Sequence, residues 1–240
     1  MRLIAVGFVS AGVLGYEVLL ARLFSIIQWY HFAYMVISIA LLGYGASGTF
    51  LAVMRHRLEG RAPAAFAAFA ALFGISAVAC FALGERLPFN ALELIWDPRQ
   101  LLWLGALYAI LIVPFFCGAV CIGLALACFA EPVGRIYRAD LLGAGLGALG
   151  ILGVLFLVMP SRALELVGAL GLLAAALVSF GAPGARLRAM AYAAGALAMA
   201  FALPPAWTAL QPSPYKGLSQ ALRVPGAEVE ARRSSPLGLL

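Results

Sequence analysis

Residues 3–28 read LIAVGFVSAGVLGYEVLLARLFSIIQ, an apolar run that carries two full charges, Glu17 and Arg22. The run is longer than the about 20 residues that an α-helix needs to cross the hydrocarbon core of a bilayer. A charge in that core costs roughly 3 kcal/mol on insertion scales, so such residues usually face a bundle interior and a partner. Glu17 and Arg22 are therefore the leading candidates for a functional role.

The composition of the whole chain agrees with this membrane interpretation. Hydrophobic residues make up 65% of the 240 residues and charged residues 11%, and the mean hydropathy is +1.03. Soluble domains carry a smaller apolar and a larger charged share. The net charge of +6 comes from bases that lie mainly between apolar runs, which is typical of loop charges and not of a nucleic-acid surface. The expected partner is the lipid bilayer, and nucleic acid is not expected.

Further apolar runs follow the first one at regular intervals. All the runs lie near residues 3–28, 32–54, 63–83, 101–129, 141–159, 163–180 and 187–203. Helices fit these lengths, because barrel strands alternate in polarity over only about ten residues. We therefore predict an all-α, polytopic transmembrane helix bundle of about seven spans over residues 1–205, followed by a tail, residues 206–240.

The distribution of arginine predicts an orientation with the N-terminus inside. The inner segments then hold Arg2, Arg55, Arg57, Arg61, Arg135, Arg138, Arg186 and Arg188, and the outer loops hold Arg86, Arg99 and Arg162. Seven spans place the basic tail outside, against the same rule. A break of the fourth span at Pro114 is the leading explanation for a miscount, although a plain kink is the favoured interpretation of this proline, with carbonyls lining a cavity as the alternative.

Glu17 and Arg22 make a poor pair within one helix. Residues five apart point about 140° away from each other, since each residue turns about 100°. We expect each charge to find a partner on another helix, with Asp140 and Arg138 as candidates if the fifth span packs against the first. Asp140 has a second and favoured interpretation as the cap of the fifth helix, whose free amides attract a carboxylate.

The small residues of the fifth run indicate close helix packing. Gly143 and Gly147 are four apart, the spacing that lets another helix approach closely in lipid. His31 follows Gln28, Trp29 and Tyr30 and is interpreted as a residue of the interfacial girdle, because no companion ligands accompany it. We expect no metal, no cofactor and no catalytic constellation in this chain.

The chain contains three distinctive stretches: GYEVLLARLF at residues 15–24, HFAYMVISIALLGYGASG at residues 31–48 and YRADLLGAGLG at residues 137–147. Together they resemble the membrane domain that precedes spermidine-synthase-like domains in bacteria. In the tail, YKGLS at residues 215–219 and the stretch 226–238 are similar to the approach to the soluble synthase domain. Residues 227–232 alternate apolar and charged side chains, which predicts a half-exposed strand.

The resemblance implies a non-catalytic membrane domain of the bacterial inner membrane that anchors or docks a synthase-like domain linked to polyamine metabolism. The adenosyl-cofactor and amine sites of that family lie beyond residue 240, so the chain is interpreted as a fragment or truncated relative without synthase activity. A second copy of the chain is an alternative partner. The alternative function is a transporter or exporter of a small cation such as a polyamine, with Glu17 at a midplane site.

Overall fold

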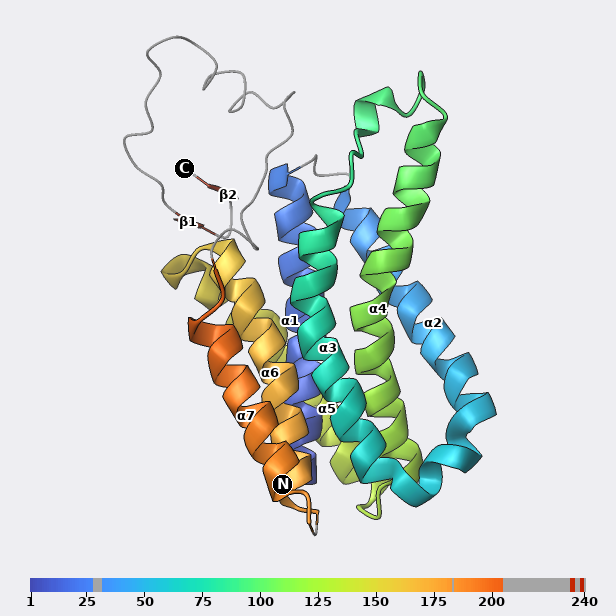
Figure 1. Ribbon diagram of the computed structural model, residues 1–240, viewed down its shortest axis with the longest axis vertical. Coiled ribbons are helices and arrows are strands. Elements are labelled where there is room, and N and C mark those ends of the chain that lie inside the picture. The colour runs from blue at the N-terminus through green and yellow to red at the C-terminus, as the bar shows by residue number, and fades with distance from the viewer. Residues whose placement is uncertain (28–31, 183, 205–233, 236–237, 240) are drawn as a thin grey trace.

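The computed structural model describes residues 1–27, 32–182, 184–204, 234–235 and 238–239, which form an all-helical bundle and one short strand pair (Figure 1). The helices are α1 (Arg2–Ile27), α2 (Phe32–Leu58), α3 (Ala62–Gly84), α4 (Arg99–Cys128), α5 (Val133–Leu157), α6 (Pro160–Phe180) and α7 (Arg186–Phe201). Short 3₁₀ turns are η1 (Glu59–Arg61) and η2 (Ala91–Glu93), and the strands are β1 (Ser234–Ser235) and β2 (Gly238–Leu239).

Five segments are long and apolar enough to cross a membrane among the described residues. They are Arg2–Ile27, Tyr34–Gly84, Arg99–Cys128, Val133–Leu157 and Pro160–Phe180. The second segment, of 51 residues, contains both α2 and α3, which η1 separates. Helix α7 has 16 residues, about 24 Å at 1.5 Å per residue, and is shorter than the about 30 Å of a bilayer core. The predicted all-helical fold is confirmed and is consistent with a multi-pass membrane protein, and the count of about seven crossings stays a prediction.

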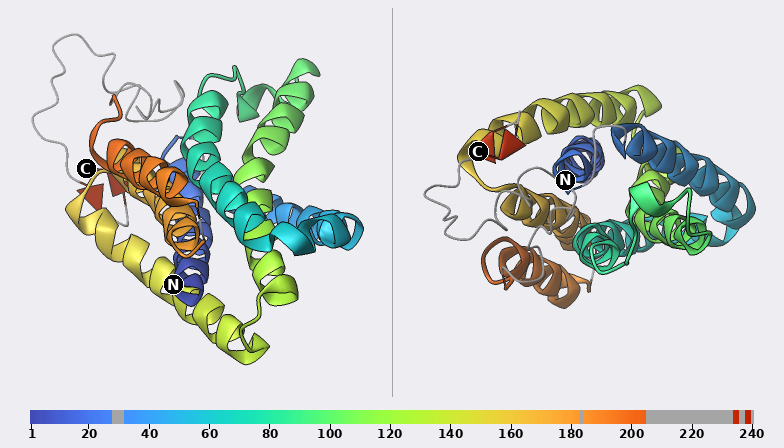
Figure 2. Two further views of the ribbon diagram at one scale, coloured as in Figure 1. Left: turned by 60° about the horizontal axis from the view of Figure 1, so that its bottom comes forward. Right: turned by 90° about the horizontal axis from the view of Figure 1, so that it is seen from above.

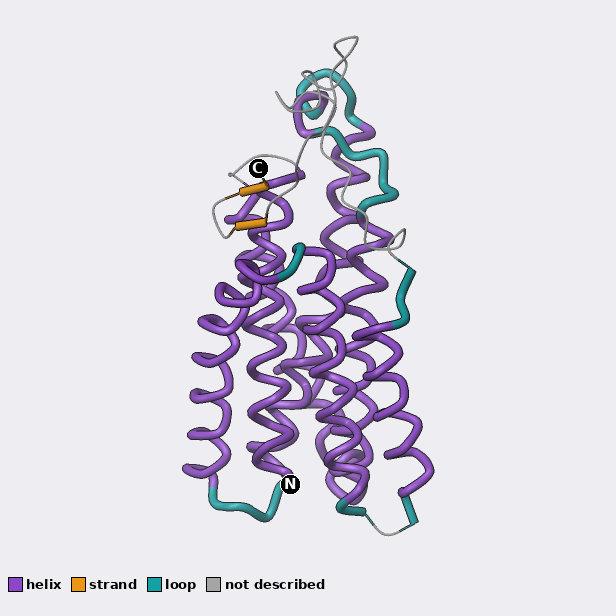
Figure 3. Tube along the Cα trace, turned by 90° about the vertical axis from the view of Figure 1, so that its left-hand side faces the viewer, coloured by secondary structure: helices purple, strands orange, loops and turns teal. Residues whose placement is uncertain are grey.

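Helix α1 lies at the centre of the bundle (Figure 2). It contacts α2, α4, α5 and α6, whereas α7 packs on the outside against α6. The N-terminus and the turns α2–α3, α4–α5 and α6–α7 lie at one end, which we call the basic end because it holds the eight arginines predicted to face inward. The arginines of the predicted outer loops lie toward the opposite end (Figures 1 and 3).

The predicted close approach at Gly143 and Gly147 brings α5 onto α1. A methyl group at Gly143 would lie 2.7 Å from Gly7 Cα, and one at Gly147 would lie 2.5 Å from Ala11 Cα, both far inside ordinary contact distance. The two backbones therefore touch, as small residues four apart allow in lipid. This crossing fixes which side chains of α1 and α5 can reach each other.

Helix α4 continues through Pro114 from Arg99 to Cys128. The interpretation of Pro114 as a break that changes the number of spans is therefore wrong. Packing against α1, α2 and α3 holds the helix on both sides of the missing hydrogen bond, and neighbouring helices are what make proline tolerable in a membrane helix. Phe115, the next residue, lies against Gly43 of α2, where an added methyl group would come within 2.7 Å of Phe115 Cβ.

The end of the chain changes from helix to strand. After α7, β1 and β2 pair antiparallel, with Ser234 opposite Leu239 and Ser235 opposite Gly238. The strand predicted at residues 227–232 lies outside the described residues, as do the stretch 215–219 and His31 with its neighbours Trp29 and Tyr30.

Candidate functional site

The close crossing of α1 and α5 brings Ser10 to Asp140. The Ser10 hydroxyl donates a hydrogen bond of 2.6 Å to Asp140 Oδ1 across the two helices. Gly7, one turn from Ser10, and Gly143, one turn from Asp140, form the backbone contact beside this bond. A serine side chain is short, so it reaches the opposite helix only where the backbones approach this closely.

The Ser10 hydroxyl has two acceptors within reach and a single proton. It lies 3.0 Å from the carbonyl oxygen of Val6 as well as 2.6 Å from Asp140. When Asp140 is ionised, the Ser10 proton points to the carboxylate. When Asp140 is protonated, the acid donates to Ser10, and Ser10 donates to Val6. The pair therefore satisfies its hydrogen bonds in both protonation states of Asp140.

Glu17 lies two turns further along the same face of α1. Seven residues turn about 700°, so Glu17 is within about 20° of Ser10 around the helix and about 10 Å along it. Tyr44 of α2 donates a long hydrogen bond of 3.4 Å to Glu17 Oε2. The half-buried Glu17 does have a partner on another helix, but this partner is neither Asp140 nor Arg138.

A cavity of about 300 Å³ lies beside the Ser10–Asp140 contact and reaches Tyr44. Its polar lining consists of Ser10, Tyr44 and Asp140, and the Tyr44 hydroxyl bridges from this lining to Glu17. The remaining lining residues are apolar: Val13, Leu14, Ala119, Ile122 and Ala144. Asp140 is seven residues, about 10 Å, into α5, and Glu17 is about 22 Å into α1, so the polar groups are staggered along the bundle axis.

Neither carboxylate has a cationic partner in the part of the chain that the structure describes. The described ion pairs join Arg2 to Glu131, Arg55 and His56 to Glu59, and Arg162 to Glu165. Asp140 and Glu17 accept hydrogen bonds only from hydroxyl groups there. Carboxylates without a cationic partner are rare within a membrane bundle and commonly mark a functional site, which makes Asp140 and Glu17 the candidates here.

Arg22 does not neutralise Glu17, in agreement with the angular argument. Its Nη1 atom donates a hydrogen bond of 3.3 Å to Ser25 Oγ within α1, while Nε and Nη2 are buried with no described partner. Arg138, the other predicted partner, is exposed at the basic end. The predicted pairing of Glu17 and Arg22 with α5 is therefore wrong.

The favoured interpretation of Asp140 as the cap of the fifth helix is wrong. The helix begins at Val133 after Pro132, so Asp140 belongs to its interior. The sequence prediction started the span at the first uninterrupted apolar residue and assigned the polar stretch 135–138 to a loop. A helix can extend beyond the apolar core, however, because arginine and tyrosine side chains point outward toward the headgroups.

Three polar residues of the interior were missed by the sequence analysis. Ser10 and Tyr44 lie in apolar runs and carry no charge to mark them. Glu165 was visible, because it is an acidic residue within the run 163–180. Its side chain is fully buried and accepts a 2.6 Å bond from Arg162 Nη1 one turn earlier in α6.

The described residues offer no cluster of three or more histidine, cysteine or acidic side chains that could hold a metal ion. Cys80, Cys117, Cys121 and Cys128 are free thiols. Cys121 is fully buried, and its thiol lies 3.5 Å from the carbonyl oxygen of Phe66, the contact of a small structural side chain.

No family model, curated protein or solved structure matches this chain.

Proposed function

We propose that this chain is a multi-pass protein of the bacterial inner membrane whose bundle binds and exchanges a small cation, such as a polyamine, at Asp140 and Glu17. The observation that carries the proposal is the pair of carboxylates with no described cationic partner. Asp140 lines a cavity of about 300 Å³ together with Tyr44, and Tyr44 is the hydrogen-bond partner of Glu17. This volume is at the lower end of the range of ligand pockets. Ionisable residues inside a membrane bundle commonly mark substrate or ion pathways.

The proton-adaptable contact of Asp140 supports an exchange of cation against proton. A cation that enters the cavity is attracted by the ionised carboxylate, while Ser10 holds one carboxylate oxygen in place. When the cation leaves, a proton takes its place and the hydrogen bond reverses its direction toward Val6. Tyr44 gives Glu17 a hydroxyl partner, and its oxygen can also accept a bond from an ammonium group.

The proposal includes seven crossings with the N-terminus inside. It is supported by the alternation of the helices and by the eight arginines at the basic end, which the positive-inside rule assigns to the cytoplasm. On this orientation Asp140 lies about 10 Å from the cytoplasmic start of α5, and Glu17 is deeper.

Flux measurements in vesicles test the proposal. Proteoliposomes that contain the whole chain should take up labelled spermidine in a saturable manner. Asp140→Asn should reduce this flux about tenfold or more, because the cation loses its bond to the charged Asp140 carboxylate, and a hydrogen bond to a charged group contributes about 1.5–3 kcal/mol. Asp97→Asn is the matched control, since Asp97 lies in the α3–α4 loop and caps the backbone N–H of Arg99. Thermal unfolding of each variant confirms that it is folded.

Two results would overturn the proposal. One is the absence of saturable flux for spermidine, putrescine, potassium and sodium with the unmodified chain. The other is equal flux in Asp140→Asn and Asp97→Asn, which would remove the intramembrane carboxylate from the pathway.

A second function, the anchoring of a soluble synthase-like domain, is favoured by one observation. The strands β1 and β2 pair at the place in the chain where the resemblance implies the start of that domain. A reporter fused after Leu240 that is active only in the cytoplasm distinguishes the two functions. A cytoplasmic reporter combined with no cation flux would favour the anchor, and an external reporter would exclude a cytoplasmic synthase partner.

A further inference from the structure

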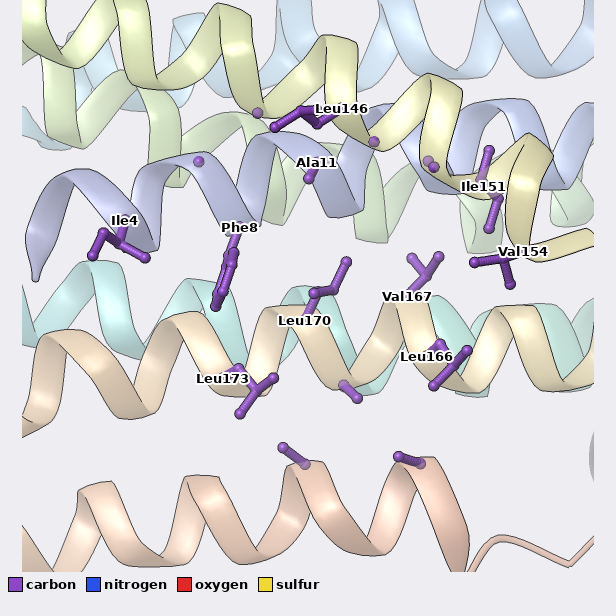
Figure 4. A pocket seen from close by; sticks show the side chains of 18 of the residues that line it. Ile4, Phe8, Ala11, Leu146, Ile151, Val154, Leu166, Val167, Leu170 and Leu173 are labelled. Carbon is purple, nitrogen blue, oxygen red and sulfur yellow. The ribbon is translucent and has the colours of Figure 1, made fainter.

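A second and larger cavity lies on the other side of α1 from the polar site. It is a groove of about 770 Å³ with α1 and α5 as one wall and α6 and α7 as the other (Figure 4). Its α1 wall runs from Leu3 to Gly15, about 18 Å along the helix. On α5 the lining extends from Ala139 to Val154, so the groove follows the long axis of the bundle.

Every side chain of the groove is apolar. Ile4, Phe8, Leu146, Leu166 and Leu170 are typical, and the other lining positions carry glycine, alanine, valine, leucine, isoleucine or phenylalanine. Sites for polar ligands contain a few polar groups that fix the orientation of the ligand, and this groove has none of them. Its lining therefore suits a hydrocarbon chain.

Basic residues continue the groove at one end only. Arg135 is one turn before Ala139 and belongs to the same stripe of α5. Arg138 is likewise one turn before the lining residue Leu142, so it lies at the same end of this stripe of α5. Both arginines are exposed and have no ion pair in the described part of the chain.

The opposite end of the groove offers no comparable charge. The nearest base there is Arg162, one turn before the lining residue Leu166, and it is neutralised by Glu165 at 2.6 Å. At the basic end, Arg2 is similarly engaged, by Glu131 at 3.8 Å and by the ring of Phe129. The basic end of the groove therefore carries positive charge without a described ion pair at Arg135 and Arg138 of α5.

We propose that the groove is a binding site for an anionic phospholipid, with one acyl chain between α1, α5, α6 and α7 and the phosphate headgroup bound by Arg135 and Arg138. Basic residues at the cytoplasmic ends of membrane helices attract anionic headgroups, each contributing about 1 kcal/mol. The basic end is the end that the arginine distribution assigns to the cytoplasmic leaflet, where such lipids are concentrated.

A helix of a second copy fits the groove less well. A helix about 10 Å across and 18 Å long occupies roughly 1,400 Å³, which exceeds the groove volume of about 770 Å³. A helix also needs small residues or interhelical hydrogen bonds at its interface. The groove has no hydrogen-bonding side chain, and its small residues Gly7, Ala11, Gly143 and Gly147 are already used in the contact of α1 with α5.

Two variants with matched controls test the lipid site by native mass spectrometry of the whole purified chain in detergent. The probes are dioleoylphosphatidylglycerol and dioleoylphosphatidylcholine. Gly150→Leu places a side chain in the groove without a clash, because a methyl group at Gly150 meets nothing within 4 Å. Gly145→Leu is the control, because Gly145 is equally open but does not line the groove. Arg135→Gln removes the charge, and Arg99→Gln at the opposite end is its control.

The unmodified chain should retain one phosphatidylglycerol molecule more tightly than phosphatidylcholine. Gly150→Leu should abolish retention of both lipids, and Arg135→Gln should weaken phosphatidylglycerol binding about fivefold and leave phosphatidylcholine binding unchanged. Equal retention of the two lipids by the unmodified chain would overturn the headgroup assignment. Equal behaviour of Gly150→Leu and Gly145→Leu, or a mass that corresponds to two chains without lipid, would overturn the groove as a lipid site.

Discussion

Replacement of Gly147 by alanine should separate α1 from α5 and disrupt the polar site at a distance. The added methyl group would lie 2.5 Å from Ala11 Cα, and ordinary contact begins at 3.4 Å, so the helices must move apart by about 0.9 Å. The same movement lengthens the Ser10–Asp140 bond from 2.6 Å to about 3.5 Å, beyond the 2.5–3.0 Å of a good hydroxyl hydrogen bond.

The expected cost combines two effects. Overpacking a tight contact costs about 1–3 kcal/mol, and loss of a hydrogen bond to a charged group costs about 1.5–3 kcal/mol. Partial relaxation shares the strain between them, so we expect a loss of about 2–4 kcal/mol in the free energy of unfolding. Steric trapping or reversible unfolding in bicelles measures this quantity. Gly145→Ala is the control, because a methyl group there meets nothing within 4 Å and faces outward.

A difference below about 0.5 kcal/mol between Gly147→Ala and Gly145→Ala would refute the reasoning, because the backbone contact of α1 and α5 could not then be close. Loss of cation flux without loss of stability would show that the effect on flux does not depend on a strained contact between α1 and α5.

Three further variants test separate parts of the bundle. Tyr16→Phe should raise the free energy of unfolding by up to about 1 kcal/mol, since the fully buried Tyr16 hydroxyl has no described partner. A decrease in this free energy of more than about 1 kcal/mol would show that the hydroxyl has a partner. Glu165→Gln should lower the free energy of unfolding by about 1–3 kcal/mol, because it weakens the buried contact with Arg162. Denaturant titration measures this free energy, and an unchanged unfolding midpoint would contradict the contact. Glu17→Gln should reduce cation flux less than Asp140→Asn, because the Tyr44 bond of 3.4 Å holds Glu17 more loosely, and a larger effect of Glu17→Gln would reverse the order of the two sites.

The sequence predicts the helices well because the bilayer sets their length. An apolar run of about 20 residues leaves a helix as the only structure that satisfies the backbone in lipid. The predicted run at residues 63–83 became α3, Ala62–Gly84, within one residue at each end. The start of α5 was misplaced by eight residues, from Leu141 to Val133, because hydropathy marks where lipid contact begins and not where the backbone becomes helical.

The sequence predicts the polar candidates of the site but not their partners. Glu17 and Asp140 are visible as charges near or within apolar runs, and the small residues Gly143 and Gly147 indicate a close crossing. The partner helix and its register depend on backbone contacts such as Gly143 against Gly7, which no pattern in one chain specifies. Ser10 becomes a functional candidate only through that register, because a serine in an apolar run is otherwise an ordinary packing residue.

The hydrogen bonds to the two carboxylates, Asp140 and Glu17, differ in length, which suits a series of cation sites better than a fixed structural contact. Asp140 has a short bond of 2.6 Å, Glu17 a long one of 3.4 Å, and the two anchoring positions on α1 are about 10 Å apart along the helix axis. A buried structural pair would be expected to resemble Arg162 and Glu165, where a base neutralises the acid directly. Transport requires a cation to bind strongly enough to enter and weakly enough to leave, which several modest sites in series achieve. Tyr44 is bonded to Glu17 and lines the same cavity as Asp140, which is the arrangement that the proposed exchange of a cation requires.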